Sequence, residues 1–550
     1  MNKKIILVLA LLITAFVAKT SAQKLLNDYS GDTNVVEIQI RNVNINRLKV
    51  FERDDKDWFF GSNLANKLHC LTREYIIRDE LLFTDDSLVE ESFVDETERN
   101  LRASELFTDV KIQYDSVTPY SYDVYVTTKD RWSFFPEALI GVGGDNYQYG
   151  ARLTETNLLG AGIFVSAEAL HRSESNIGWQ EILQFKNKRL FRSELGLELY
   201  MLYHQYRTDY SINLEKPYRT LDTKFSYGIF LENMYGYDFK YNNSVDFDTL
   251  YLHKRLASVF FSRGWMRTDR VFASALFEVS DVVRPDPTYE QAFDNGGKVL
   301  LQFSSVTRYF HKVSRINQYH KEDLPTGGYG QAVIGYTFPM FGNGEYLYYV
   351  AGEGEQSYYK DGLYLYGRVQ GSSGFAGGAA KYTYEEATGL AFYQFSDFLV
   401  LGARFQQQTV WNWHKYHQLI LDNESGLRGY RLNGLTGDNR IIANLELRVF
   451  PDWRVWVFDL AGVAFWDIGT VWNETIAINK AQWHNALGAG MRFHFTKSSS
   501  LKHTFRIDAS YNFDEKGFGS ITFGNEQHFN FFGKHDYKKP KIFGTQYDYE

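Results

Sequence analysis

Residues 195–201 read LGLELYM and place an apolar side chain at every second position. Residues 225–229 (FSYGI) and 445–449 (LELRV) repeat this alternation. Successive side chains of a β-strand point to opposite faces, so each stretch predicts a strand with one apolar face and one more polar face. Such stretches recur from Phe134 to Phe529, and they predict a chain that is mainly β.

The alternation by itself fits both a soluble β-sandwich and a transmembrane β-barrel, and three features favour the barrel. Residues 134–529 are too many for one sandwich, and they contain no dividing linker rich in proline or glycine. Aromatic residues make up 17% of the chain, enough to supply the girdles that barrels place at both membrane interfaces. The single cysteine excludes the disulfide pairs that commonly stabilise small exported domains.

The length of this segment bounds the number of strands. A membrane-crossing strand takes about 9–11 residues, and short turns alternate with longer loops in such barrels. At about 25 residues for each strand with its connection, residues 134–529 predict an antiparallel barrel of about 16 strands, and about 14 or 18 would fit nearly as well. Residues 530–550 follow the last predicted strand, and we expect them to form a tail on the periplasmic side.

Residues 1–22 predict a secretory signal peptide. Lys3 and Lys4 precede an apolar run over residues 5–18, and small residues follow it up to the expected cleavage site. A membrane-spanning helix needs about 20 apolar residues, and Lys19 interrupts this run too early. An exported chain without a helical anchor is either soluble outside the inner membrane or a membrane barrel.

A small α+β domain is predicted over residues 35–130. Residues 36–40 (VEIQI) alternate as a strand, and Thr72 and Asp95 suit the beginnings of two helices. Two further strands follow before residue 130. The predicted order is β-α-α-β-β, which by itself also fits a generic α+β domain.

Composition and motif content argue against several classes of function. The chain has 67 acidic and 59 basic residues and a formal net charge of −8, which disfavours nucleic-acid binding. One cysteine excludes a multi-thiolate zinc or iron–sulfur site. The sequence contains neither a phosphate-binding loop nor a nucleophile elbow. We therefore expect no enzymatic activity, no catalytic residue, no metal and no cofactor.

Three sequence pieces occur in a set order near the end of the predicted barrel. They are residues 427–430 (LRGY) in a polar, glycine-rich stretch, residues 444–448 (NLELR) and residues 465–472 (FWDIGTVW). The loop motif, the acid and the Asp-x-Gly strand resemble motifs of the bacterial surface antigen (outer-membrane assembly factor) superfamily. Residues 98–110 resemble the second helix and second strand of a polypeptide-transport-associated (POTRA) domain. Each motif alone has little specificity, whereas the ordered set spans most of the chain.

The resemblance implies that the loop folds back into the barrel lumen, where its arginine binds acids of the inner wall in a paired fork. The residues concerned are Arg428, Gly429 and Tyr430 of the loop, the acids Glu446 and Asp467, and Gly469 of the strand motif. Glu446 is opposite in phase to its apolar neighbours, so strand parity also predicts that it faces inward. Without the resemblance, the residues favour a solvated loop charge for Arg428 and an ordinary lumenal acid for Asp467.

The resemblance also implies a function. We expect an outer-membrane factor of a Gram-negative bacterium that translocates proteins or inserts β-barrels, with its POTRA-like domain in the periplasm. Its partners would be unfolded outer-membrane or exported polypeptides, the lipid bilayer, and accessory periplasmic or lipoprotein subunits, with no nucleic acid. Two alternatives stay open: a passive outer-membrane channel or receptor, and a non-transporting membrane anchor in a larger complex. Residues 23–130 have room for one POTRA-like domain, and this single domain is the reason why the membrane anchor stays an alternative.

Overall fold

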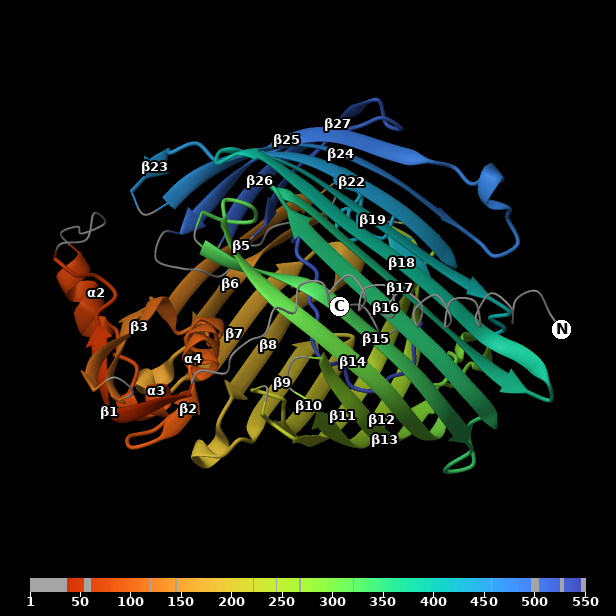
Figure 1. The fold of residues 1–550 in the computed structure, drawn as a ribbon. Helices are drawn as coiled ribbons and strands as arrows, with labels where there is room; N and C mark the ends of the chain where they lie inside the picture. The colour runs from red at the N-terminus through yellow and green to blue at the C-terminus, as the bar shows by residue number, and fades with distance from the viewer. Residues whose placement is uncertain are drawn as a thin grey trace.

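The structure is a computed structural model in which a small mixed domain lies beside one end of a large barrel (Figure 1). It describes residues 37–53, 61–118, 121–143, 146–220, 222–243, 245–266, 269–319, 321–456, 458–495, 504–524 and 529–545. The predicted signal peptide, residues 1–22, lies outside the described residues.

Within the described residues, the small domain is a four-stranded sheet with three short helices. Its elements are β1 (Glu37–Leu48), α2 (Ser62–Leu68), α3 (Glu74–Arg78), β2 (Leu88–Glu90), α4 (Ser92–Ala103), β3 (Phe107–Thr118) and β4 (Ser121–Asp130). The strand order is β2-β1-β4-β3, with β1 parallel to β4 and the other pairs antiparallel. The predicted β-α-α-β-β order is contained in this series, and α2 and β2 are additional. None of the helices in the described residues has the length and apolar composition needed to cross a membrane.

Apolar residues from the helices and the sheet form the core of this domain. Ile40 and Val124 of adjacent strands are completely buried, as are Ile77 of α3 and Leu101 of α4. Helix α4 begins three residues before Asp95, so Asp95 lies in its first turn instead of capping it. An acid in the first turn still favours the helix, because it faces the positive end of the helix dipole.

The second part of the chain is a closed antiparallel barrel. Among the described residues it contains twenty strands of eight or more residues and the two-residue β23 (Arg454–Val455). Each pairs with the strands next to it around the ring, and β27 closes against β5. The strands are β5 (Phe134–Gly143), β6 (Asn146–Glu155), β7 (Ile163–Arg172), β8 (Gly178–Asn187), β9 (Gly196–His204), β10 (Arg207–Lys216), β11 (Phe225–Tyr241), β12 (Phe247–Trp265), β13 (Asp269–Val283), β14 (Gly296–Ser314), β15 (Lys321–Phe338), β16 (Leu347–Lys360), β17 (Leu363–Ala376), β18 (Ala379–Ser396), β19 (Leu399–Trp411), β22 (Asn439–Val449), β24 (Phe458–Trp472), β25 (His484–Phe495), β26 (Thr504–Asn512) and β27 (Gly517–Gly524).

The prediction of about 16 strands is therefore wrong, because connections at both ends of the barrel are shorter than assumed. Strands β16 and β17 are separated by Asp361 and Gly362, and strands β17 and β18 by Gly377 and Gly378. Tight turns that need a positive φ suit glycine, and Gly362 has a φ of +80°. Each strand with its connection thus takes about 20 residues instead of about 25.

The wall alternates as the sequence predicts. Leu445 and Leu447 of β22 are 40% and 38% exposed on the outside, whereas Glu446 between them is buried. In β11, Tyr227 is exposed and Ser226 is completely buried. A sandwich in water would bury its apolar face, whereas this barrel presents that face outward, as a bilayer requires. The prediction of a mainly β chain, with an antiparallel barrel after a small α+β domain, is confirmed.

The chain re-enters the barrel after the last strand. Residues 529–545, which we call the tail, pack against inward-facing side chains, and Phe531, His535 and Phe543 are completely buried. Figure 1 shows this dark blue segment within the ring of strands. The sequence predicts a periplasmic extension here, but its described part lies in the lumen, because its lysines and aromatic residues find partners on the inner wall. Residues 546–550 lie outside the described residues.

Candidate functional site

A loop between β19 and β22 folds back into the barrel. It contains a short hairpin of β20 (Leu419–Leu421) and β21 (Leu435–Gly437). Leu421 and Leu427 of the loop are completely buried and pack with Ile442 of the wall. The space for this packing is provided by Gly469 of β24, since an added Cβ there would lie 3.0 Å from Leu421 Cδ1. An apolar anchor therefore fixes the loop inside the lumen.

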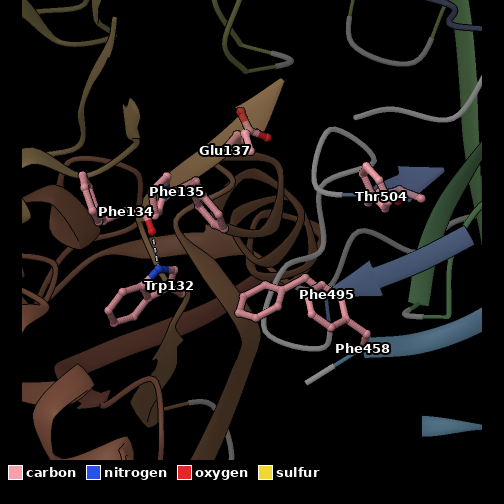
Figure 2. Close-up of a pocket in the computed structure, with 10 residues that line it drawn as sticks. Trp132, Phe134, Phe135, Glu137, Phe458, Phe495 and Thr504 are labelled. Carbon is pink, nitrogen blue, oxygen red and sulfur yellow. Dashed lines mark hydrogen bonds between the residues drawn. The ribbon is translucent and has the colours of Figure 1, made fainter. Parts of the chain in front are cut away.

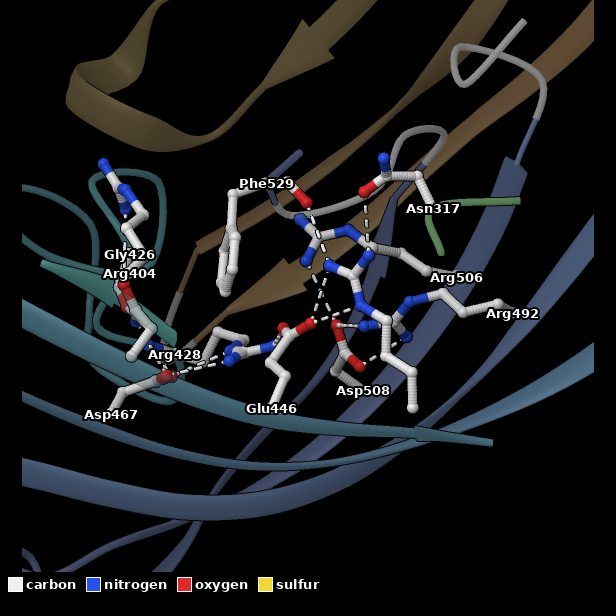
Figure 3. Close-up of polar contacts among 12 residues, drawn as sticks. Asn317, Arg404, Gly426, Arg428, Glu446, Asp467, Arg492, Arg506, Asp508 and Phe529 are labelled. Carbon is white, nitrogen blue, oxygen red and sulfur yellow. Dashed lines mark hydrogen bonds and ion pairs between the residues drawn. The ribbon is translucent and has the colours of Figure 1, made fainter. Parts of the chain in front are cut away.

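Arg428 is the centre of the polar contact between this loop and the wall (Figure 3). Its Nε and Nη2 donate to the two carboxylate oxygens of Asp467 at 2.7 and 2.8 Å, and its Nη1 donates to Glu446 Oε1 at 2.6 Å. The guanidinium also lies 3.6 Å from the ring centroid of Phe465. Both acids are completely buried and the arginine is 1% exposed. We call the contact of Arg428 with Glu446 and Asp467 the lumenal lock.

The lumenal lock continues to the C-terminal tail through a second buried arginine. Glu446 Oε2 accepts from Arg448 Nε at 2.9 Å, so one carboxylate bridges Arg428 and Arg448. Arg448 donates from Nη1 to Asn317 Oδ1 (3.1 Å) and from Nη2 to the backbone carbonyl of Phe529 (3.0 Å). Loop, wall and tail thus share one network of charge-assisted hydrogen bonds.

The other two residues of the loop motif fix the backbone beside Arg428. Gly429 has a φ of +87°, and an added Cβ would lie 2.5 Å from Ser510 Oγ. Tyr430 is buried, and its hydroxyl donates to Asp514 Oδ2 (3.0 Å) and accepts from the backbone N–H of Asn485 (3.1 Å). Glycine is required at 429 for two reasons, the left-handed backbone and the close approach of β26.

We expect Gly429→Ala to destabilise the lumenal lock by about 1–3 kcal/mol, because a side chain is strained at this φ and meets Ser510. The measurement is the midpoint of thermal unfolding in detergent. Gly462→Ala in β24 is the matched control, since an added Cβ there meets no atom within 4 Å, and we expect its effect to stay within about 0.5 kcal/mol. Equal midpoints for the two variants would contradict this account of Gly429.

The structure brings all six predicted site residues to one place, and it adds partners that the sequence analysis missed. Asn444 donates to Asp467 Oδ1 at 2.7 Å, Phe465 stacks on Arg428, and Arg448 shares Glu446. Asn444 and Arg448 lie two residues from Glu446, and Phe465 lies two residues from Asp467. Strand alternation alone therefore predicts that these three side chains face the lumen with the acids. No signal of that kind points to Asn317, which lies in the connection between β14 and β15, far away in the sequence.

A buried carboxylate joins the small domain to the barrel. Asp130 Oδ2 accepts from the backbone N–H (2.7 Å) and hydroxyl (3.0 Å) of Thr72, and it lies 2.9 Å from His69 Nε2. The Thr72 hydroxyl accepts from Asn157 Nδ2, in the connection after β6, at 2.8 Å. The next residue, Arg131, is buried, and this burial lowers the pKa of its guanidinium to about 10. The small domain is therefore held against a defined turn of the barrel.

Strand β3 forms an edge of the small sheet. Within the described residues it pairs with β4 on one side and with no strand on the other. Its second half is exposed to solvent. An exposed edge carries unpaired backbone N–H and C=O groups, to which an extended polypeptide can add as a further strand.

An aromatic pocket of about 390 Å³ lies between the first strand of the barrel, β5, and strands β24–β26 (Figure 2). Its lining comes from one residue before β5, from β5 itself and from β24–β26, and consists of Trp132, Phe134, Phe135, Pro136, Glu137, Ala138, Phe458, Phe495, Thr504 and Phe505. Proline has no backbone N–H, so Pro136 removes one donor from the first strand. The pocket suits an apolar or aromatic side chain.

The described residues contain no group of three or more His, Cys, Asp or Glu side chains arranged to hold a metal ion.

Comparisons with known proteins concern the fold. No protein-family model matches the sequence, and no curated protein matches it. Solved structures do match over most of the chain. The chain is similar in fold to BamA and CdiB.

BamA from Haemophilus ducreyi lacking POTRA domains 1–3 matches with a TM-score of 0.38 and 12% identity, over 88% of this chain and 84% of that one. CdiB from Escherichia coli matches with a TM-score of 0.43 and 12% identity, over 89% and 76%. CdiB from Acinetobacter baumannii has a TM-score of 0.42 and 12% identity, over 88% and 73%.

Proposed function

We propose that this protein inserts or translocates polypeptides at the outer membrane of a Gram-negative bacterium. The barrel lies in the bilayer, and the small domain faces the periplasm and receives unfolded outer-membrane or exported polypeptides. Accessory periplasmic or lipoprotein subunits are further partners. The protein is not an enzyme and uses no cofactor, so client folding and burial in lipid supply the free energy.

The observation that carries this proposal is the lumenal lock. Two completely buried acids are placed on neighbouring strands, β22 and β24, to hold one loop arginine. Taking three charged groups out of water is costly unless they satisfy one another. A barrel that only needed a stable wall could use apolar packing there, so the pattern supports a loop whose position matters for function.

The small domain supports the same function. The open edge of β3 offers an extended client backbone groups to pair with, and the domain contacts the barrel through the hydrogen bond from Asn157 to Thr72. A client bound there would be held close to the barrel. The aromatic pocket between β5 and the last strands then offers a place for an apolar client side chain.

Two other functions have weaker support. A passive channel or receptor whose lumen admits small solutes needs an open path, whereas both the loop and the tail lie in this lumen. A membrane anchor without transport fits the single small domain, but it gives no reason for the buried arginine and its two acids. Both alternatives predict no general effect on other outer-membrane proteins.

Depletion of the protein followed by quantitative proteomics of the outer membrane tests the proposal. We expect many barrel proteins to decrease if the protein inserts barrels, or one exported protein to disappear from the surface if it is a dedicated translocator. Complementation with wild type should restore the profile. An unchanged outer-membrane and surface proteome after depletion would contradict the proposed function.

A further inference from the structure

The tail crosses the lumen as an extended segment. Its alternate residues Phe531, Gly533 and His535 are buried against the wall, and Lys534 between them is exposed. Tail residues contact inward-facing side chains of β10, β12 to β17, β19 and β22. The tail therefore contacts a large part of the inner wall.

Acidic side chains of the wall bind the basic residues of the tail. Glu353 and Glu355 of β16 are 1% and 5% exposed. Lys538 Nζ contacts both carboxylates, with 3.1 Å to Glu355 Oε2. His535 faces Glu355 Oε1 through Nδ1 at 3.3 Å, and Lys539 Nζ lies 2.5 Å from Glu215 Oε2 of β10. Three cationic or ionisable side chains of the tail thus each face an acid.

Aromatic contacts accompany the ion pairs. The ring of Tyr537 lies 4.9 Å from those of Tyr218 and Phe272, and its hydroxyl is 2.9 Å from Ser274 Oγ. Lys538 and Lys539 lie over the rings of Tyr329 (4.8 Å) and Phe260 (4.9 Å). Ring and carboxylate together recognise a lysine better than either does alone.

The tail is bound to the barrel without being part of its sheet. The barrel closes through β27 and β5, and within residues 529–545 no strand pairing is formed. In each polar contact between the tail and the wall, at least one of the two partners is a side chain. The wall acids also keep other partners, since Glu353 accepts from Gln331 (2.6 Å) and Glu355 from Tyr366 (2.7 Å). The tail can therefore leave without breaking the backbone hydrogen bonds between the barrel strands, and both acids then keep a hydrogen-bond partner.

We propose that the inner wall around Glu215, Glu353 and Glu355 is a binding site for an extended polypeptide segment rich in lysine and aromatic residues, and that the tail is its resident ligand. While bound, the tail closes the lumen to ions. A polypeptide segment of the same chemistry competes with the tail for this site. The inference concerns the isolated barrel and does not rest on the proposed function.

The test uses a chain that ends at residue 533, which keeps the Phe529–Gly533 anchor, and a synthetic peptide of residues 534–545. In planar bilayers, we expect the shortened barrel to conduct ions steadily and the full-length barrel to conduct much less. The added peptide should bind the shortened barrel and block its current. Higher salt should weaken binding, because screening weakens charged contacts.

Matched peptides separate specific recognition from general charge attraction. K538E and K534E change the peptide's net charge equally, but Lys538 meets two acids and Lys534 is exposed. We expect K538E to bind about 10- to 100-fold more weakly and K534E to bind nearly as well as the unchanged peptide. Equal affinities for the two peptides, or no rise in conductance after shortening, would overturn the proposal.

A full-length variant keeps the proposal testable if the shortened chain does not fold. Glu353→Gln with Glu355→Gln should raise the conductance of the full-length barrel by loosening the tail. Glu232→Gln is the matched control, because Glu232 pairs with Lys254 (2.9 Å) of the neighbouring strand. Unchanged conductance in the double variant would overturn the proposal. These currents are measured on pure protein, so their outcome is independent of the depletion experiment.

Discussion

Arg428→Ala is expected to lower the stability of the barrel by about 3–5 kcal/mol and to impair function as severely as depletion does. The estimate follows from leaving a buried charge without its partner. Without the guanidinium, Asp467 keeps one side-chain donor, Asn444, and Glu446 keeps Arg448. The damage should therefore centre on Asp467 and on the loop backbone, whose N–H at residue 428 also binds this acid at 3.2 Å.

Arg431→Ala is the matched control for this prediction. Arg431 lies in the same loop and faces Glu515 at 3.6 Å, but both side chains are about half exposed. An exposed ion pair contributes about 0–1 kcal/mol, so this variant should unfold and function nearly as wild type does. Arg428→Lys should fall between the two, because an ammonium cannot form the paired fork. Thermal unfolding in detergent and complementation of depleted cells provide the two readouts.

Exchanging the charges of Arg428 and Asp467 should not restore function. The exchange would place a carboxylate beside Glu446, which now binds Arg428 at 2.6 Å. Two buried carboxylates near each other repel. If Arg428→Ala unfolds at the wild-type temperature and complements fully, the lumenal lock has no functional role.

The lumenal lock was expected only from the family resemblance and its motif order, whereas strand parity predicted that Glu446 faces inward. Glu446 had to face inward once Leu445 and Leu447 faced the bilayer. In the structure Glu446 is buried on the inner side, and both leucines are exposed on the outer side. The domain order and the alternating wall were accessible from local sequence pattern as well. The strand number could not be predicted in this way, since it depends on turn lengths such as the two-residue turn at Asp361 and Gly362.

The path of the tail could not be predicted from local pattern. Parity does indicate that Glu353 and Glu355 share one face of a strand, and that face is the lumen. Which cation they bind depends on the closed ring, which brings a lysine 183 residues away to Glu355. A tail rich in lysine is equally compatible with solvent until the wall that faces it is known.

The second large effect is expected at the contact of the tail with β19. Phe531 is completely buried, its ring lies 3.9 Å from the Arg448 guanidinium, and its backbone N–H donates to Asn317 Oδ1 at 3.1 Å. Phe531→Ala should weaken tail binding by about 3–5 kcal/mol, the usual cost of removing a buried ring. The loss cannot exceed the free energy of tail binding, because beyond that point the tail detaches and the barrel remains.

Gly402 of β19 makes this contact testable by a double-mutant cycle. A Cβ added at residue 402 would overlap the ring of Phe531, so Gly402→Ala should also displace the tail. In the double variant the new methyl group occupies space that the ring has left. The double variant should therefore lose no more free energy of tail binding than Phe531→Ala alone. The difference from additivity gives a coupling energy of about 1–3 kcal/mol. Tail occupancy, read as blocked conductance, and thermal unfolding measure each corner of the cycle.

Gly462→Ala supplies the control cycle, since its Cβ would meet no atom within 4 Å. Combined with Phe531→Ala, its effect should be additive, because the two sites share no contact that either change removes. Additivity between Gly402→Ala and Phe531→Ala would show that the ring does not occupy the space above Gly402. The tail would then lie elsewhere, and the closure of the lumen by residues 529–545 would be contradicted together with the contact itself.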